Sequence, residues 1–185
     1  NYTVFFYDYT DFFATATGTG GNFIVVNQDA EFYGVEFEAT ARMTEQLDLF
    51  ASLGWQEGKY RGVPADSTIG DEPQRMPQWT AKVGTTWVKP VGDNDAFRFT
   101  VDWNYNEDYF TNLQNTPIGR SGEVHIWNAL AAFEFDDGRY AISASCKNCL
   151  DNDYLTQSFD FAGINFVQVY PGMPREWMVG FKAKF

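Results

Sequence analysis

Apolar and polar residues alternate along most of this chain, as they do along β-strands that have one wet and one apolar face. The pattern is clearest over 96–105, where every second position is aromatic or aliphatic: Phe97, Phe99, Val101, Trp103 and Tyr105. Helical periodicity is almost absent. Between turn residues, the pattern predicts eight strands, at 1–13, 22–42, 46–59, 77–90, 95–110, 122–135, 139–149 and 174–185.

The last strand is the most informative, because a soluble protein seldom ends on a long amphipathic strand. One face of it carries Trp177, Val179, Phe181, Ala183 and Phe185. The other face carries Met178, Gly180, Lys182 and Lys184. About ten residues are enough for a tilted strand to cross a bilayer. The ending therefore indicates a membrane barrel, with the aromatic face toward lipid and the lysines toward the lumen.

The connections between the strands alternate in length. Short turns rich in Gly, Asp and Asn lie at 43–45, 90–94 and 136–138. Much longer links lie at 60–76, 111–121 and 150–173. Outer-membrane barrels have short periplasmic turns and long extracellular loops. The expected fold is all-β, an antiparallel up-and-down transmembrane β-barrel wall whose even strand count places both chain ends at the periplasmic rim.

Composition agrees with strands that carry aromatic girdles. Aromatic residues make up 18% of the chain, and the mean hydropathy is -0.36. Since no stretch approaches the roughly 18 apolar residues of a transmembrane helix, strands must make any membrane contact. The net charge of -12 argues against a nucleic-acid partner, which needs clustered Lys and Arg.

The cysteines give a weak signal. Cys146 and Cys149 form a Cys-Lys-Asn-Cys spacing, but a zinc site needs further ligands and His125 is the only histidine. A thioredoxin-like site would begin a helix, whereas these cysteines end a strand. We expect two unpaired, small apolar residues, with a local disulfide as the alternative, and no metal site or cofactor.

Two further groups of residues have the chemistry of possible catalytic sites. Glu36 and Glu38 share a strand face at a spacing of about 7 Å, which is within the range of glycosidase carboxylate pairs. A ladder of water-facing charges in a lumen explains them better. His125 has no paired Ser, Cys or second His with which to form a triad. The sequence therefore predicts no enzyme.

Five segments, in order, resemble the carboxy-terminal barrel region of TonB-dependent receptors. They are the aromatic strand at 6–12, Gly34-Val35-Glu36-Phe37-Glu38-Ala39, Pro77-Gln78-Trp79-Thr80-Ala81, Lys147-Asn148-Cys149-Leu150-Asp151-Asn152-Asp153-Tyr154, and Pro174-Arg175 with the final Gly180-Phe181-Lys182-Ala183-Lys184-Phe185. Cys149 and Leu150 stand where the family has Leu and Phe. The resemblance covers essentially the whole chain.

The resemblance implies a barrel of about 22 strands with a plugged lumen, of which residues 1–185 would form one carboxy-terminal segment without the plug. The strand-like start at Asn1 favours such a fragment. The implied function is TonB-dependent uptake of a scarce nutrient across the bacterial outer membrane, with a ferric siderophore or similar iron complex as the default cargo. The implied partners are outer-membrane lipid and lipopolysaccharide, the rest of the barrel and plug, and the TonB complex through the missing amino-terminal region. The barrel assembly machinery would read a carboxy-terminal signal at Gly180, Phe181, Ala183 and Phe185.

Contacts with a cargo are expected where a strand rises into a long link, because hydrogen-bonding and aromatic side chains gather there: Asn104, Asn106, Tyr109, Asn112 and Gln114. Ordinary solvated loop chemistry is the alternative for these residues. At the level of the whole chain, two other functions remain open. One is a self-standing small outer-membrane barrel with a structural or adhesive role, and the other is a soluble carbohydrate-binding β-sandwich.

Overall fold

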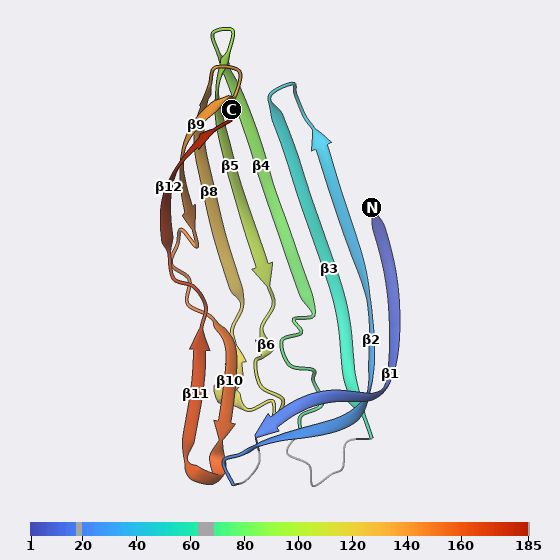
Figure 1. The fold of residues 1–185 in the computed structure, drawn as a ribbon. Coiled ribbons are helices and arrows are strands. Elements are labelled where there is room, and N and C mark those ends of the chain that lie inside the picture. Colours follow the sequence, from blue (N-terminus) through green and yellow to red (C-terminus); the bar gives the residue numbers. More distant parts are fainter. Residues whose placement is uncertain (18–19, 63–68, 185) are drawn as a thin grey trace.

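The computed structural model describes residues 1–17, 20–62 and 69–184. All eight strands predicted from the sequence occur and pair in chain order into one antiparallel sheet (Figure 1). They are β1 Tyr2–Thr17, β2 Phe23–Arg42, β3 Leu47–Arg61, β4 Trp79–Val91, β5 Asp95–Asn106, β8 Val124–Phe135, β9 Tyr140–Lys147 and β12 Glu176–Ala183. The all-β prediction is confirmed, and β1 and β12 form the two edges of the sheet.

Two of the long links contain short hairpins that the sequence did not predict. In the first, β6 (Tyr109–Phe110) pairs with β7 (Arg120–Ser121), and in the second, β10 (Leu155–Phe161) pairs with β11 (Phe166–Pro171). Turns of 3-10 helix occupy Pro117–Gly119 and Ala162–Ile164. The strand expected over 95–110 stops at Asn106, because Asp108 leaves the ladder to form an ion pair with Arg120.

The predicted asymmetry of the connections is confirmed. The three short turns lie at one rim of the sheet, at the top of Figure 1, and the long links lie at the other. The carboxy-terminal strand reaches the short-turn rim, where Lys184 N donates to the carbonyl of Arg139 at 2.9 Å. Asn1 lies slightly below that rim, beside Glu38.

One face of the sheet is apolar across all eight strands, because the strand register brings apolar positions together. One such row runs over five strands through Trp87, Phe99, Ala131, Ala144 and Val179. The face assigned to the end of the chain is confirmed by the pairing of Val179 and Phe181 with Ala144 and Ile142. Val179 is 84% exposed. Phe185 lies outside the described residues.

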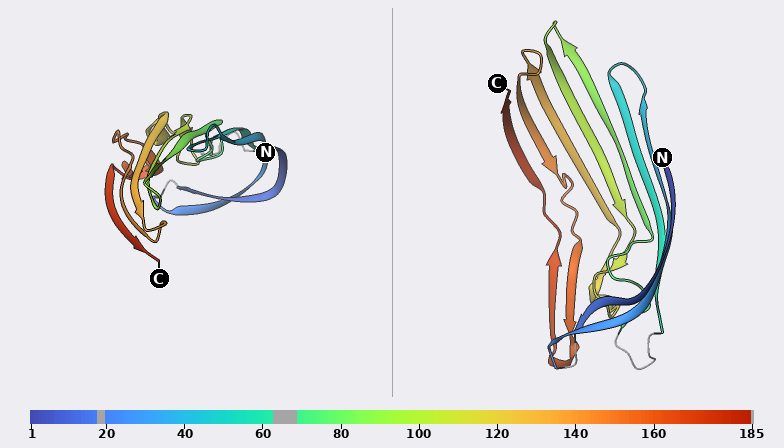
Figure 2. Two further views of the ribbon diagram at one scale, coloured as in Figure 1. Left: turned by 90° about the horizontal axis from the view of Figure 1, so that it is seen from above. Right: turned by 45° about the vertical axis from the view of Figure 1, so that its right-hand side comes forward.

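The opposite face is polar and carries paired charges. Arg98 Nε lies 2.9 Å from Glu134 Oε1, and Arg42 Nε lies 3.1 Å from Asp48 Oδ1. The register places Glu36 on this face as well, opposite Gly54. The sheet is strongly curved (Figure 2, left). Side chains crowd on the inside of a curve, and in β5 and β9 the polar face is the less exposed of the two, so we assign it to the concave side.

Aromatic side chains gather near both ends of the apolar face. Toward the long links, Trp103 lies 5.8 Å from Tyr105 and 6.3 Å from Trp127 between ring centroids. Toward the short turns, Phe97 and Phe133 lie 4.8 Å apart. Such rows are typical of strands that meet the two interfaces of a bilayer. Within the described ranges, no helix has the length and apolar character needed to cross a membrane.

Candidate functional site

Most of the deeply buried side chains of the described chain lie in the long links and in the outer part of the β1–β2 hairpin. We call this region the outer layer and define it as the described parts of 11–30, 69–78, 107–123 and 148–175. Side chains less than a tenth exposed there include Ala14, Ala16, Thr17, Ala30, Pro73, Pro77, Thr111, Asn112, Leu113, Ser121, Asn148, Ser158 and Phe161. Ala14, Ala16, Ala30 and Leu113 pack together with Tyr60 of β3, so this region has a small core of its own.

The outer part of the β1–β2 hairpin bends over this layer (Figures 1 and 2). The bend begins at a β-bulge between Tyr9 and Phe12, where Asp11 has a φ of 58°. A bulge bends its strand and increases the local twist. Beyond it, Ala14 and Ala16 join the buried cluster that also contains Leu113.

The tip of the hairpin is held against β10. The hydroxyl of Thr17 donates to the carbonyl of Asp160, and Gln114 Nε2 donates to Thr17 Oγ1 at 2.6 Å. The rings of Phe23 and Phe159 meet edge to face, with centroids 5.0 Å apart. These contacts join segments from opposite ends of the chain.

Three of the residues predicted to contact cargo contribute to this internal packing. Gln114 binds the hairpin as described above. Asn112 is only 2% exposed, and its Nδ2 donates to Thr116 Oγ1 at 2.7 Å. The hydroxyl of Tyr109 donates to the carbonyl of Leu155 at 3.0 Å. Gln114 and Tyr109 therefore link different segments of the outer layer, and Asn112 fixes the turn within its own loop.

The other two predicted contact residues lie on the concave wall below. Asn104 Nδ2 lies 3.4 Å from both Asp102 Oδ2 and the carbonyl of Ile126, and Asn106 is opposite Thr80. The structure thus divides the predicted group between the wall and the outer layer. A role in contacting cargo stays a prediction for all five residues.

A polar network connects the wall to the outer layer, and Asp102 lies at its centre. The carboxylate of Asp102 is 17% exposed, accepts a hydrogen bond from Asn128 Nδ2 at 2.7 Å, and lies 3.8 Å from Lys82 Nζ. The other end of the Asn128 amide accepts a hydrogen bond from Asn148 N at 3.1 Å. The network therefore spans β4, β5, β8 and the end of β9.

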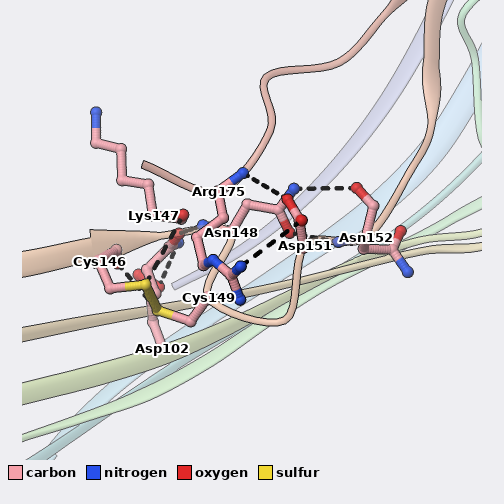
Figure 3. The surroundings of a disulfide bond; sticks show 9 residues. Asp102, Cys146, Lys147, Asn148, Cys149, Asp151, Asn152 and Arg175 are labelled. Carbon is pink, nitrogen blue, oxygen red and sulfur yellow. Dashed lines mark hydrogen bonds and ion pairs between the residues drawn. A yellow bond between two sulfur atoms is a disulfide. The ribbon is translucent and has the colours of Figure 1, made fainter. Parts of the chain in front are cut away.

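Asn148 joins three segments of the chain. Its Nδ2 donates to the carbonyls of Asn152 and Met173, each at 3.0 Å, and its Oδ1 accepts from Asn152 N at 2.9 Å. The backbone of Asn148 has a φ of 46°, a left-handed conformation that Asn tolerates better than most residues. Figure 3 shows this turn beside Asp151 and Arg175, which form an ion pair across it.

Cys146 and Cys149 form a disulfide across the same turn, so the expectation of two unpaired cysteines is wrong. The left-handed Asn148 turns the chain back and brings the two Cα atoms to 5.5 Å. Cys149 N donates to the carbonyl of Trp127 at 2.7 Å, which fixes the second cysteine against β8. Asn148, within the Cys-Lys-Asn-Cys spacing, is the residue that could have indicated a turn. An Asn alone does not specify one.

The predicted assembly signal lies on the edge strand. Gly180, Phe181 and Ala183 pair with Ser143, Ile142 and Tyr140 of β9, and Phe185 falls outside the described residues. The role of these residues in assembly stays a prediction. In the part of the chain that the structure describes, His, Cys, Asp and Glu side chains do not gather in threes as metal ligands.

Partial burial raises the pKa of the Tyr109 phenol, and a hydrogen bond with Ser121 partly opposes that shift. Because this pKa is higher in the folded state, the stabilisation by the neutral phenol is complete below the pKa of the unfolded chain, about 10. It is lost as the pH rises through the pKa of the folded state. We expect the outer layer of the wild type to become more sensitive to protease above about pH 10. Tyr109→Phe should remove that part of the pH dependence and cost about 1 kcal/mol through the lost hydrogen bond. Proteolysis rates of the wild type and the variant, measured from about pH 8 to 11, test this. The same increase in rate at alkaline pH in both proteins would contradict it.

A curved antiparallel sheet with one apolar face, one polar face, short turns at one rim and packed loops at the other defines part of the wall of a transmembrane β-barrel. The family model described as "TonB dependent receptor-like, beta-barrel" matches residues 1–149. The chain therefore belongs to the TonB-dependent receptor family, as its motifs indicated. Residues 150–185 lie beyond the matched range, but β12 continues the same sheet.

Solved structures of this class have the same fold. The ferric yersiniabactin uptake receptor FyuA from Yersinia pestis superposes with a TM-score of 0.71 at 19% identity, covering 85% of this chain and 24% of that one. The copper transporter OprC gives 0.72 at 20% identity, covering 97% and 27%. The ferric citrate transporter FecA, in its unliganded form, gives 0.73 at 19% identity, covering 98% and 28%. The chain thus spans about a quarter of the length of these structures.

Proposed function

We propose that this protein forms part of the wall and the outer layer of a bacterial outer-membrane receptor that imports a scarce nutrient with energy from the TonB complex. The cargo we favour is a ferric siderophore or a similar iron complex. The observation that carries the proposal is the family membership of a sheet whose polar concave face lies below a packed outer layer. In such an arrangement, loops meet the cargo and the wall guides it inward.

The names of the structural neighbours support this class of cargo. FyuA is described as a ferric yersiniabactin uptake receptor and FecA as a ferric citrate transporter, whereas OprC is described as a copper transporter. Two of these three carry iron complexes. Iron bound by an organic chelator is therefore our first choice for this protein.

The partners follow from the two faces of the sheet. Lipid and lipopolysaccharide would cover the apolar face, and a plug would occupy the polar side. The edges β1 and β12 would pair with the rest of the barrel. We further propose that the TonB complex acts through a region outside this chain, and that the barrel assembly machinery reads Gly180, Phe181, Ala183 and Phe185.

The two alternatives fit less well. A soluble β-sandwich would cover its apolar face with a second sheet, but here the apolar face is the exposed one, as for Phe181 at 67% exposure. A small self-standing barrel would close β1 onto β12, and these strands do not pair with each other within the described residues.

Uptake of labelled ferric siderophores by cells that carry the full-length receptor tests the proposal. The double variant Asn104→Ala and Asn106→Ala should weaken cargo affinity by about 30-fold, since two lost hydrogen bonds at about 1 kcal/mol each amount to about 2 kcal/mol. Asn94→Ala, at the short-turn rim, should leave uptake unchanged. If cells with the intact receptor took up no iron complex from a broad panel under iron limitation, the proposed cargo class would be wrong.

A further inference from the structure

The disulfide lies where the connection from β9 to β12, which forms a large part of the outer layer, leaves the sheet. The connection from β9 to β12, residues 148–175, leaves the sheet at the Cys146–Cys149 turn and carries β10 and β11. β10 in turn holds the tip of the β1–β2 hairpin through Asp160 and Phe159. The conformation of this turn therefore affects how the β9–β12 connection, with β10 and β11, is attached to the wall.

The same turn also anchors the start of the last strand. Asn148 binds the carbonyl of Met173, and Arg175 N donates to Asp151 Oδ1 at 2.8 Å. Both ends of the β9–β12 connection are thus tied together within a few residues of the disulfide. The Asn128 amide extends this contact to Asp102 on the wall.

The two sulfur atoms differ in accessibility. Cys146 is 3% exposed and packs in the sheet between Ala129 and Trp177. Cys149 is partly exposed and lies outside the ladder, on the side of the long links. A thiolate that approaches from the outer side therefore reaches Cys149 first, and Cys146 becomes the leaving group.

We infer that Cys149 is a site of thiol–disulfide exchange, at which a small thiol or dithiol opens the Cys146–Cys149 bond and loosens the β9–β12 connection. A thiolate RS⁻ attacks Cys149 Sγ, and the old S–S bond breaks with its electron pair on Cys146 Sγ, which takes up a proton. A second thiol then attacks the R sulfur of the mixed disulfide, which releases RSSR and leaves Cys149 as a thiol. The protein disulfide gains two electrons and two protons, and two RSH are oxidised to one RSSR.

Opening the bond removes a covalent ring of four residues, Cys146 to Cys149, around the left-handed Asn148. The loop-closure entropy of so small a ring corresponds to an about 20-fold change in the population of the open turn. The sheet ladders of β5 and β8 do not depend on this ring. Reduction is therefore expected to loosen the connection and leave the wall intact.

Hydrogen exchange on the purified full-length receptor, with and without dithiothreitol, tests the inference. In the wild type, the reductant should release two alkylatable thiols and speed exchange about 20-fold at the amides of Cys149, Asp151, Asn152 and Arg175. Amides of β5 and β8 should keep their rates. The double variant Cys146→Ser and Cys149→Ser should show the faster rates from the start and no response to reductant.

Two outcomes would overturn the inference. If two thiols were released but the turn amides exchanged at their former rates, the disulfide would not hold the connection. If no thiol were released under conditions that reduce oxidised glutathione, Cys149 would not be open to exchange. The wild-type comparison decides both points even if the double variant fails to fold. Because the readout does not involve uptake, it is also independent of the cargo proposed above.

Discussion

Replacement of Ala144 by Arg is expected to destabilise the barrel by about 2–4 kcal/mol, the range for a charged side chain on the lipid face near the bilayer midplane. Ala144 lies in the middle of β9 on the apolar face, opposite Ala131 and Val179. Among the described residues, the positions that adjoin Ala144 on that face are apolar, so they offer no acid to pair with the guanidinium. Urea titration of the full-length receptor in phospholipid vesicles would measure the loss.

Ser143 provides the matched control, because it is adjacent in sequence, similar in size and on the opposite face. Its neighbours across the strands are Ala132 and Gly180. Ser143→Arg should cost less than about 1 kcal/mol, as is usual for substitutions that leave a charge in contact with water. Equal destabilisation by the two variants would mean that the assignment of the faces to lipid and lumen is wrong.

Asn148→Ala is expected to have the second large effect, about 4 kcal/mol of local stability. The change removes three side-chain hydrogen bonds worth about 1 kcal/mol each and places Ala in a left-handed conformation that costs about 1 kcal/mol more. Limited proteolysis within 150–173, together with hydrogen exchange at Cys149 and Asp151, would report the opening of the turn.

Asn152→Ala is the matched control for this second variant. It replaces the same residue type within the same turn, but the side-chain Oδ1 of Asn152 is buried without a hydrogen-bond partner in the described structure. The change should therefore be close to neutral. If Asn152→Ala opened the turn as much as Asn148→Ala, the three hydrogen bonds of Asn148 would not be what holds it.

The sequence was sufficient to predict the sheet, because period-two alternation reports which face of a strand meets water and which does not. Phe97 to Tyr105 and Trp177 to Ala183 were assigned to the correct faces for this reason. The outer layer was not predicted. Its strands are short, as in β6 and β7 with two residues each, and its packing depends on contacts between distant segments, such as Thr17 with Asp160.

The disulfide was only the alternative prediction, and the Asn148 contacts were not predicted, for a related reason. Cys-Lys-Asn-Cys is compatible with a strand end, a turn or a metal site, and only the contacts with Trp127, Asn128 and Met173 select the turn. The predicted contact residues suffered from the same ambiguity. Tyr109, Asn112 and Gln114 have the chemistry of a binding site, but here Tyr109 and Gln114 join different segments and Asn112 holds its own loop.

The sheet exposes its apolar face, whereas the outer layer buries a core of its own. The stability of these two parts therefore depends on different surroundings. The strands are stable only while acyl chains or detergent cover Val179, Phe181 and their neighbours. The outer layer gains its stability by excluding water, as a small soluble domain does. A change of detergent should therefore alter the stability of the strands, and a change of salt or urea should first alter that of the outer layer. The chain would then unfold in two separable steps.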